Sequence, residues 1–101
     1  MPRPHVTSLT VRSVSDDGLR IAARVRAEVD RGGVGAIHVS WGDRSALIAD
    51  LGGQRRVSLA FKHRYPRPRT FRISTIAEAS TGECPLKESQ PATLRVRVPL
   101  R

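Results

Sequence analysis

Hydrophobic residues return at every second position in several short segments of this chain. The clearest case is residues 19–29, where apolar and mostly charged positions alternate: Leu19, Ile21, Ala23, Val25, Ala27 and Val29 against Arg20, Ala22, Arg24, Arg26 and Glu28. A helix would bring apolar residues back every three or four positions, whereas a period of two is that of a half-buried strand. The pattern therefore predicts a strand over 19–29, entered through the turn signal Asp16-Asp17-Gly18.

Five further segments show the same alternation. Residues 5–14 predict a first strand that is kinked at a bulge, and residues 37–41, 57–64, 71–78 and 94–98 predict others. Gly and Pro residues between them predict turns, at 31–35 for example. Residues 44–53 leave three possibilities open: a helical turn, an extra edge strand or a packed loop. The spacing predicts a single all-β domain over 1–101, a sandwich or barrel of about seven antiparallel strands.

Three short motifs occupy the middle third of the chain: Trp41-Gly42-Asp43-Arg44-Ser45, His63-Arg64-Tyr65 and Pro68-Arg69-Thr70-Phe71. In order and spacing they resemble the hallmarks of PKD domains, a Trp before Gly-Asp-Gly-Ser, then His-Thr-Tyr, then Pro-Gly-Thr-Tyr. The resemblance implies an immunoglobulin-like sandwich that serves as a spacer, adhesion or accessory module. Arg44 and Arg69 stand where the family pattern has Gly. An Arg held at positive φ in a turn costs on the order of 1 kcal/mol.

Most residues of these motifs have a structural role that can be argued from their own chemistry. Trp41 ends an inward-facing set and is expected to provide a large part of the core. Asp43, in the turn after Gly42, can accept backbone N–H groups. His63 continues the inward register of its strand, which predicts a buried, hydrogen-bonded residue. Tyr65 is expected at the edge of the core with its hydroxyl on a backbone carbonyl, and Phe71 is expected in or at the edge of the core.

Composition adds bounds on compartment and membrane association. Hydrophobic residues make up 39% of the chain, which suffices for a packed core. No apolar run approaches the roughly 20 residues of a membrane helix, and the N-terminal residues lack the apolar core of a secretory signal. We expect a protein that stays inside the cell, or a domain that is extracellular or on the cell surface as part of a longer exported chain. The one cysteine, Cys84, cannot form an internal disulfide.

Positive charge is the least ordinary feature of the composition. The formal net charge is +9, and all but Lys62 and Lys87 of the 18 basic residues are Arg. One interpretation is an anionic partner such as nucleic acid or an acidic glycan. The other, which we favour, is the codon bias of a GC-rich genome, because the chain contains no Asn. In an immunoglobulin-like order the candidate polyanion contacts fall on two opposite faces: Arg20, Arg24 and Arg26 on one, and Arg72, Arg95 and Arg97 on the other.

Candidate catalytic and metal-binding residues are few. Ser40, Asp43 and His63 have the residue types of a hydrolase triad, but Ser40 points outward and no strained Gly-x-Ser-x-Gly turn is present. The three His residues have no ligand spacing. Asp16-Asp17 and Asp43 could bind calcium at one end of a sandwich, although the surrounding positive charge opposes it. We therefore expect no enzyme activity, no metal and no cofactor.

These patterns favour a non-catalytic binding or structural module that contacts a protein partner or a larger assembly. Its expected contact regions are residues 80–91, residues 44–53 and the exposed edges of the sheets. The alternative is a basic, electrostatic binder of nucleic acid or another polyanion. Neither hypothesis includes a membrane span or a small-molecule substrate.

Overall fold

A computed structural model describes residues 4–29, 33–79 and 89–100. Seven strands follow one another along the chain, and the described residues contain no helix: β1 (His5–Ser13), β2 (Arg20–Glu28), β3 (Val34–Ser40), β4 (Ala46–Gln54), β5 (Arg56–Arg64), β6 (Arg69–Ala79) and β7 (Ala92–Val98). Accordingly, this part of the chain has no helix that could cross a membrane.

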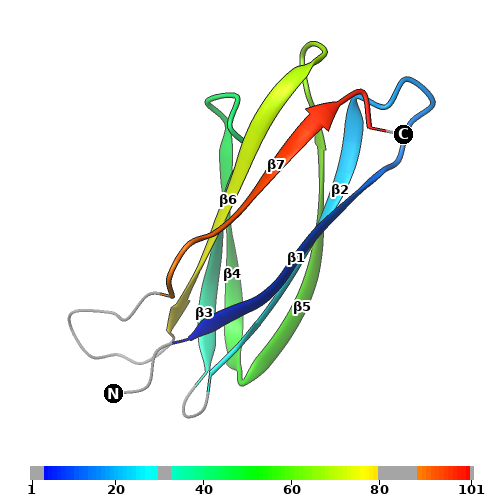
Figure 1. Cartoon of the computed structure of the whole chain (residues 1–101). Coiled ribbons are helices and arrows are strands. Elements are labelled where there is room, and N and C mark those ends of the chain that lie inside the picture. The colour runs from blue at the N-terminus through cyan, green and yellow to red at the C-terminus, as the bar shows by residue number, and fades with distance from the viewer. Residues whose placement is uncertain (1–3, 30–32, 80–88, 101) are drawn as a thin grey trace.

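The strands form two antiparallel sheets that pack face to face (Figure 1). One sheet has three strands in the order β1-β2-β5, and the other has four in the order β4-β3-β6-β7. The pairing of β2 with β5 and of β6 with β7 is the one expected for an immunoglobulin-like order. The predicted all-β sandwich of about seven strands is therefore confirmed.

The core lies between the sheets and is built by the alternation that predicted the strands. Ile21, Val25, Ile37 and Ile73 are fully buried there, while most of their chain neighbours are polar or charged and face outward, Ala22 and Ala36 being the exceptions. Trp41 and Tyr65 are the largest fully buried side chains. Tyr65 thus belongs to the core itself, whereas the sequence placed it at the core edge.

Several strand boundaries differ from those predicted. The ambiguous segment 44–53 is an edge strand, β4, which pairs with β3 and runs through Gly52 and Gly53 to Gln54. Strand β3 begins at Val34, inside the segment predicted as a turn, because pairing with β4 and β6 on both sides extends it. The expected irregularity in β1 is present as a register shift between Val6 and Ser8.

The turns that join β1 to β2, β3 to β4 and β5 to β6 lie together at one end of the sandwich, where β7 also ends (Figure 1). Of the loop predicted at residues 80–91, residues 80–88 and with them Cys84 lie outside the described residues. Ser89 is buried and joins the chain back to β6, since its N–H donates to the Ala77 carbonyl and its hydroxyl accepts from the Ala77 N–H.

Candidate functional site

Four rings from the three sequence motifs form a continuous column at the end that carries these turns. Trp41 stacks on His63 with ring centroids 4.6 Å apart, His63 meets Tyr65 edge-on at 4.8 Å, and Tyr65 stacks on Phe71 at 4.2 Å. The Tyr65 hydroxyl donates to the Trp41 carbonyl at 2.9 Å, the kind of bond its sequence context predicted. Burial of the ring, and then the negative charge of Asp43, raise the pKa of Tyr65. The column therefore packs beneath the β3–β4 and β5–β6 turns, because Trp41 directly precedes the first and Tyr65 the second.

Beside the column, Asp43 lies in the turn between β3 and β4 and binds two partners, Ser45 in the same turn and His63 on β5 of the other sheet. Its Oδ1 accepts from the Ser45 hydroxyl and, at 3.1 Å, from the Ser45 N–H, and its Oδ2 lies 2.7 Å from His63 Nε2. Burial opposes ionisation of the carboxyl, but together the Ser45 hydroxyl, His63 and the Ser45 N–H outweigh burial and lower the pKa of Asp43. The sequence placed Asp43 and His63 on separate elements, and the structure brings them into contact.

The group of Asp43, Ser45 and His63 has the residue types of a hydrolytic triad but another arrangement. In a triad, Ser and Asp bind opposite nitrogens of the imidazole, so that the ring can take the proton of the hydroxyl. Here Asp43 and Ser45 both face Nε2 of His63, and the Ser45 hydroxyl donates to Asp43. With Nε2 donating to Asp43, that nitrogen has no lone pair for the Ser45 proton. Ser40, the serine suggested by the sequence, is exposed on the outer face of β3.

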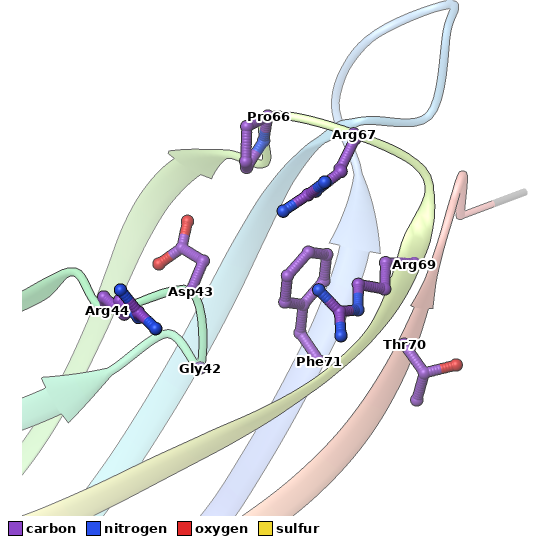
Figure 2. A pocket seen from close by; sticks show the side chains of 8 residues that line it. All are labelled: Gly42, Asp43, Arg44, Pro66, Arg67, Arg69, Thr70 and Phe71. Atoms are coloured by element: carbon purple, nitrogen blue, oxygen red, sulfur yellow. The ribbon is translucent and has the colours of Figure 1, made fainter.

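A larger feature at the same end is a hollow of about 510 Å³ that we call the basic hollow. It is lined by two turns and the start of β6: Gly42, Asp43, Arg44, Pro66, Arg67, Arg69, Thr70 and Phe71. Figure 2 shows the side chains of Arg67 and Arg69 extending over the Phe71 ring, with Arg44 on the other side of the hollow next to Asp43. All three Arg residues are exposed, whereas Phe71 is buried. The base of the hollow is thus formed by the apolar Phe71 ring, and its sides carry the positive charges of Arg44, Arg67 and Arg69.

The arginines of the basic hollow have no anionic partner among the described residues. Elsewhere in the described part of the chain, two Arg side chains do form ion pairs, Arg56 with Glu28 and Arg64 with Asp17. Hydrogen bonds from Ser15, Arg64 and the Leu19 N–H lower the pKa of Asp17, which is held in the turn between β1 and β2. Unpaired guanidinium groups that face one hollow are available to an external anion.

The six arginines that the sequence selected as polyanion contacts are exposed, but they occupy two outer faces. Arg72 and Arg95 are direct cross-strand partners on β6 and β7, and Arg97 pairs with Thr70. Arg20, Arg24 and Arg26 lie on β2 in the other sheet, where Arg24 donates to Ser58. The set on β6 and β7 lies next to the basic hollow, because Thr70, the cross-strand partner of Arg97, lines that hollow. The set on β2 belongs to a separate surface.

A second hollow, of about 210 Å³, lies on the outer face of the four-stranded sheet, and we call it the apolar hollow. Strands β3, β4 and β6 line it with His38, Val39, Ser40, Ala46, Leu47, Ile48, Ser74 and Ile76. Ile48 on the edge strand is 62% exposed, the largest exposure of a big hydrophobic side chain among the described residues. His38 Nε2 contacts Glu78 at 2.9 Å at the border of this surface.

The contact regions predicted from the sequence included residues 44–53 and the sheet edges, which contribute Ala46, Leu47 and Ile48 to the apolar hollow, but the basic hollow was not predicted as a site. Arg44 was noted as a departure from a family pattern and as the first residue of the expected contact region 44–53, and Arg69 only as such a departure. Arg67 was not selected, because residues 44 and 67–69 are distant in the chain and meet only in the folded end. Ile48 carried a usable signal: it is an apolar residue in a segment whose alternation puts Leu47 and Leu51 inward. That signal required knowing that the segment is a strand.

Comparisons with protein-family models, with characterised proteins and with solved structures find no match for this chain. In the part of the chain that the structure describes, no three His, Cys, Asp or Glu side chains are grouped so that they could hold a metal ion.

Proposed function

We propose that this domain is a non-catalytic binding module that docks an acidic protein partner on the outer face of its four-stranded sheet. The observation that carries the proposal is the apolar hollow beside the edge strand β4, with Ile48 62% exposed. Protein interfaces combine an apolar centre with a polar rim in which Arg is enriched. On this face Ile48 and Ile76 supply the apolar centre, and Arg72 and Arg95 lie on the neighbouring strands of the same sheet.

Strand β4 is also a sheet edge that is open to pairing with another chain. It is nine residues long, and its sequence has no Lys, Arg or Pro, whereas the other edge strands β1, β5 and β7 each carry at least one Arg. Charged residues and Pro on edge strands are a common protection against pairing. The absence of Lys, Arg and Pro from β4, whose one charged residue is Asp50, supports docking by strand addition, in which main-chain hydrogen bonds give affinity and side-chain pockets give specificity.

The net charge of +9 argues for an acidic partner and against a second copy of this chain. Two such domains repel each other at long range, whereas an acidic protein is attracted and can place carboxylates on Arg72 and Arg95. We propose further that the chain is a PKD-like domain; the packing of Trp41, His63 and Tyr65 in one column supports a common structural role for its motifs.

A photo-crosslinking amino acid at position 48 tests the docking site, with the same amino acid at position 60 as control. Ala60 is exposed on the edge strand β5 of the other sheet. In the native cells we expect an adduct with a discrete acidic protein from position 48 and none from position 60. With the purified partner, Ile48→Glu should raise Kd by roughly tenfold or more, and Ala60→Glu by less than about twofold.

Three results would overturn the proposal. These are equal adducts at both positions, no adduct at position 48, or a Kd that Ile48→Glu leaves unchanged. Sedimentation of the purified domain adds a fourth: self-association that Ile48→Glu abolishes would make the apolar hollow an interface between copies of this chain.

A further inference from the structure

The backbone of Arg44 in the basic hollow is strained. Its φ is 73°, in the left-handed region that Gly adopts without cost and residues with a side chain adopt only under strain. Hydrogen bonds hold the turn in this form: Trp41 N–H donates to the Ser45 carbonyl at 3.0 Å, and Asp43 accepts from Ser45. Backbone strain of this kind persists where the surroundings enforce it and is concentrated at binding sites. The strained conformation places a guanidinium at the hollow where Gly would fit without strain.

The other two arginines are also held by rigid backbone. Arg67 stands between Pro66 and Pro68, so its neighbours have fixed φ angles and its own conformation is restricted by the proline that follows. Arg69 is the first residue of β6 and pairs with Val98. A site whose backbone is ordered before binding loses less entropy when it takes a ligand.

The charges that line the basic hollow favour a ligand with two negative charges. Arg44, Arg67 and Arg69 supply three positive charges and Asp43 one negative charge, which leaves two positive charges. The carboxylate of Asp43 is occupied by Ser45 and His63, so it repels an incoming anion less than a free carboxylate would. A planar carboxylate offers two oxygens and one charge, whereas a phosphate monoester offers three terminal oxygens and nearly two charges at neutral pH.

We propose that the basic hollow is a binding site for a phosphate monoester group. The three guanidinium groups surround the phosphate oxygens from the two turns and from β6, and the Phe71 floor limits how deeply the group enters. The site differs from the docking face of β4 in residues and in ligand chemistry. It also differs from a general polyanion surface, because its arginines line one hollow while Arg20, Arg24 and Arg26 lie on the other sheet.

Calorimetric titration of the purified domain at pH 7.5 and about 0.15 M ionic strength tests the site, since at this salt distant charges are screened beyond roughly 8 Å. The probes are inorganic phosphate as a dianion, and methyl sulfate and acetate as monoanions. We expect phosphate to bind at least roughly tenfold more tightly than either monoanion. Equal binding of all three probes, or no binding of phosphate, would overturn the proposal.

Two variants with the same net charge separate the hollow from the overall charge. Arg44→Gln, Arg67→Gln and Arg69→Gln combined should remove phosphate binding, with a loss of roughly tenfold for each single change. Arg24→Gln, Arg26→Gln and Lys62→Gln combined remove three charges from the exposed face of the other sheet and should change the affinity by less than about twofold. Equal losses in the two triple variants would contradict a discrete site.

The source of the phosphate group is resolved by two further ligands, a short phosphoserine peptide and glycerol 3-phosphate. Tighter binding of the peptide identifies a phosphorylated protein segment, and tighter binding of glycerol 3-phosphate identifies a small phosphorylated molecule. Failure of both to bind while inorganic phosphate binds would overturn the assignment to a monoester. Ile48→Glu should leave all of these affinities within about twofold, so the phosphate site and the proposed docking face can fail separately.

Discussion

The two hollows of this domain lie on the same sandwich but are built in different ways. The apolar hollow is a depression in the pleated outer face of β3, β4 and β6, lined by side chains at their ordinary strand positions. The basic hollow is made by turns, and it depends on a left-handed Arg44, on two prolines and on the bonds of Asp43. Side chains of the apolar hollow can thus be substituted without disturbing the backbone, whereas the basic hollow requires the specific turn structure that supports it.

The largest expected difference between the hollows concerns Asp43. Asp43→Ala leaves the Ser45 N–H and His63 without their partner in a largely buried position, which should lower the free energy of unfolding by about 3 kcal/mol. Asp50→Ala on the exposed side of β4 should lower it by less than about 0.5 kcal/mol. Urea unfolding of both variants checks this, and similar losses would show that the turn is not specially supported.

Acid should weaken the same support. The pKa of Asp43 is lower in the folded than in the unfolded chain, so its contribution to stability is complete above its ordinary value of 3.8 and is lost as the pH falls through the lowered folded value. Asp17 contributes in the same direction. Unfolding measured from pH 7 to pH 3 should therefore show a smaller loss of stability in Asp43→Asn than in the original chain. Parallel curves would contradict the role of the carboxylate.

A smaller effect of opposite sign is expected at Arg44. Arg44→Gly should raise the free energy of unfolding by about 1 kcal/mol, because Gly adopts a φ of 73° without strain, while phosphate affinity falls. Arg44→Ala is the matched control: it removes the same guanidinium but keeps the strain, so its stability should stay near that of the original chain. If Gly and Ala have equal stability, Arg44 is not strained in solution.

The smallest effect on stability is expected at the apolar hollow. Ile48→Thr exchanges one β-branched residue for another at an exposed strand position and should change the free energy of unfolding by less than about 0.5 kcal/mol. Thermal and urea unfolding measure this directly. A loss above about 1.5 kcal/mol would mean that Ile48 supports the fold and is not free for a partner.

Alternation of apolar residues was sufficient to predict most of the fold. The inward positions of β2, β5 and β7 follow a period of two closely, and β2 pairs with β5, and β6 with β7, as an immunoglobulin-like order requires. Residues 44–53 were ambiguous because Ala46, Leu47 and Ile48 are consecutive apolar residues, and only pairing with β3 decides which of them face outward. Tertiary pairing also extends β3 back to Val34 against its local Gly-rich sequence.

The candidate sites were less accessible from the sequence. Roles for Asp43 and Tyr65 followed from their local context, and their hydrogen bonds are of the expected kind. The contact of Asp43 with His63 and the grouping of Arg44, Arg67 and Arg69 depend on where two distant turns meet. Sixteen Arg residues in one chain conceal the few that face a common hollow.

The central claim is that anion binding is confined to one hollow of an otherwise basic surface. The most direct test is to follow backbone amide chemical shifts while inorganic phosphate is added at physiological ionic strength. We predict shifts concentrated in residues 42–45 and 66–71, with little change in β2 or β4. Shifts of equal size along the outer face of β2, at Arg20, Arg24 and Arg26, would contradict the claim and would show that the charge acts as a general surface property.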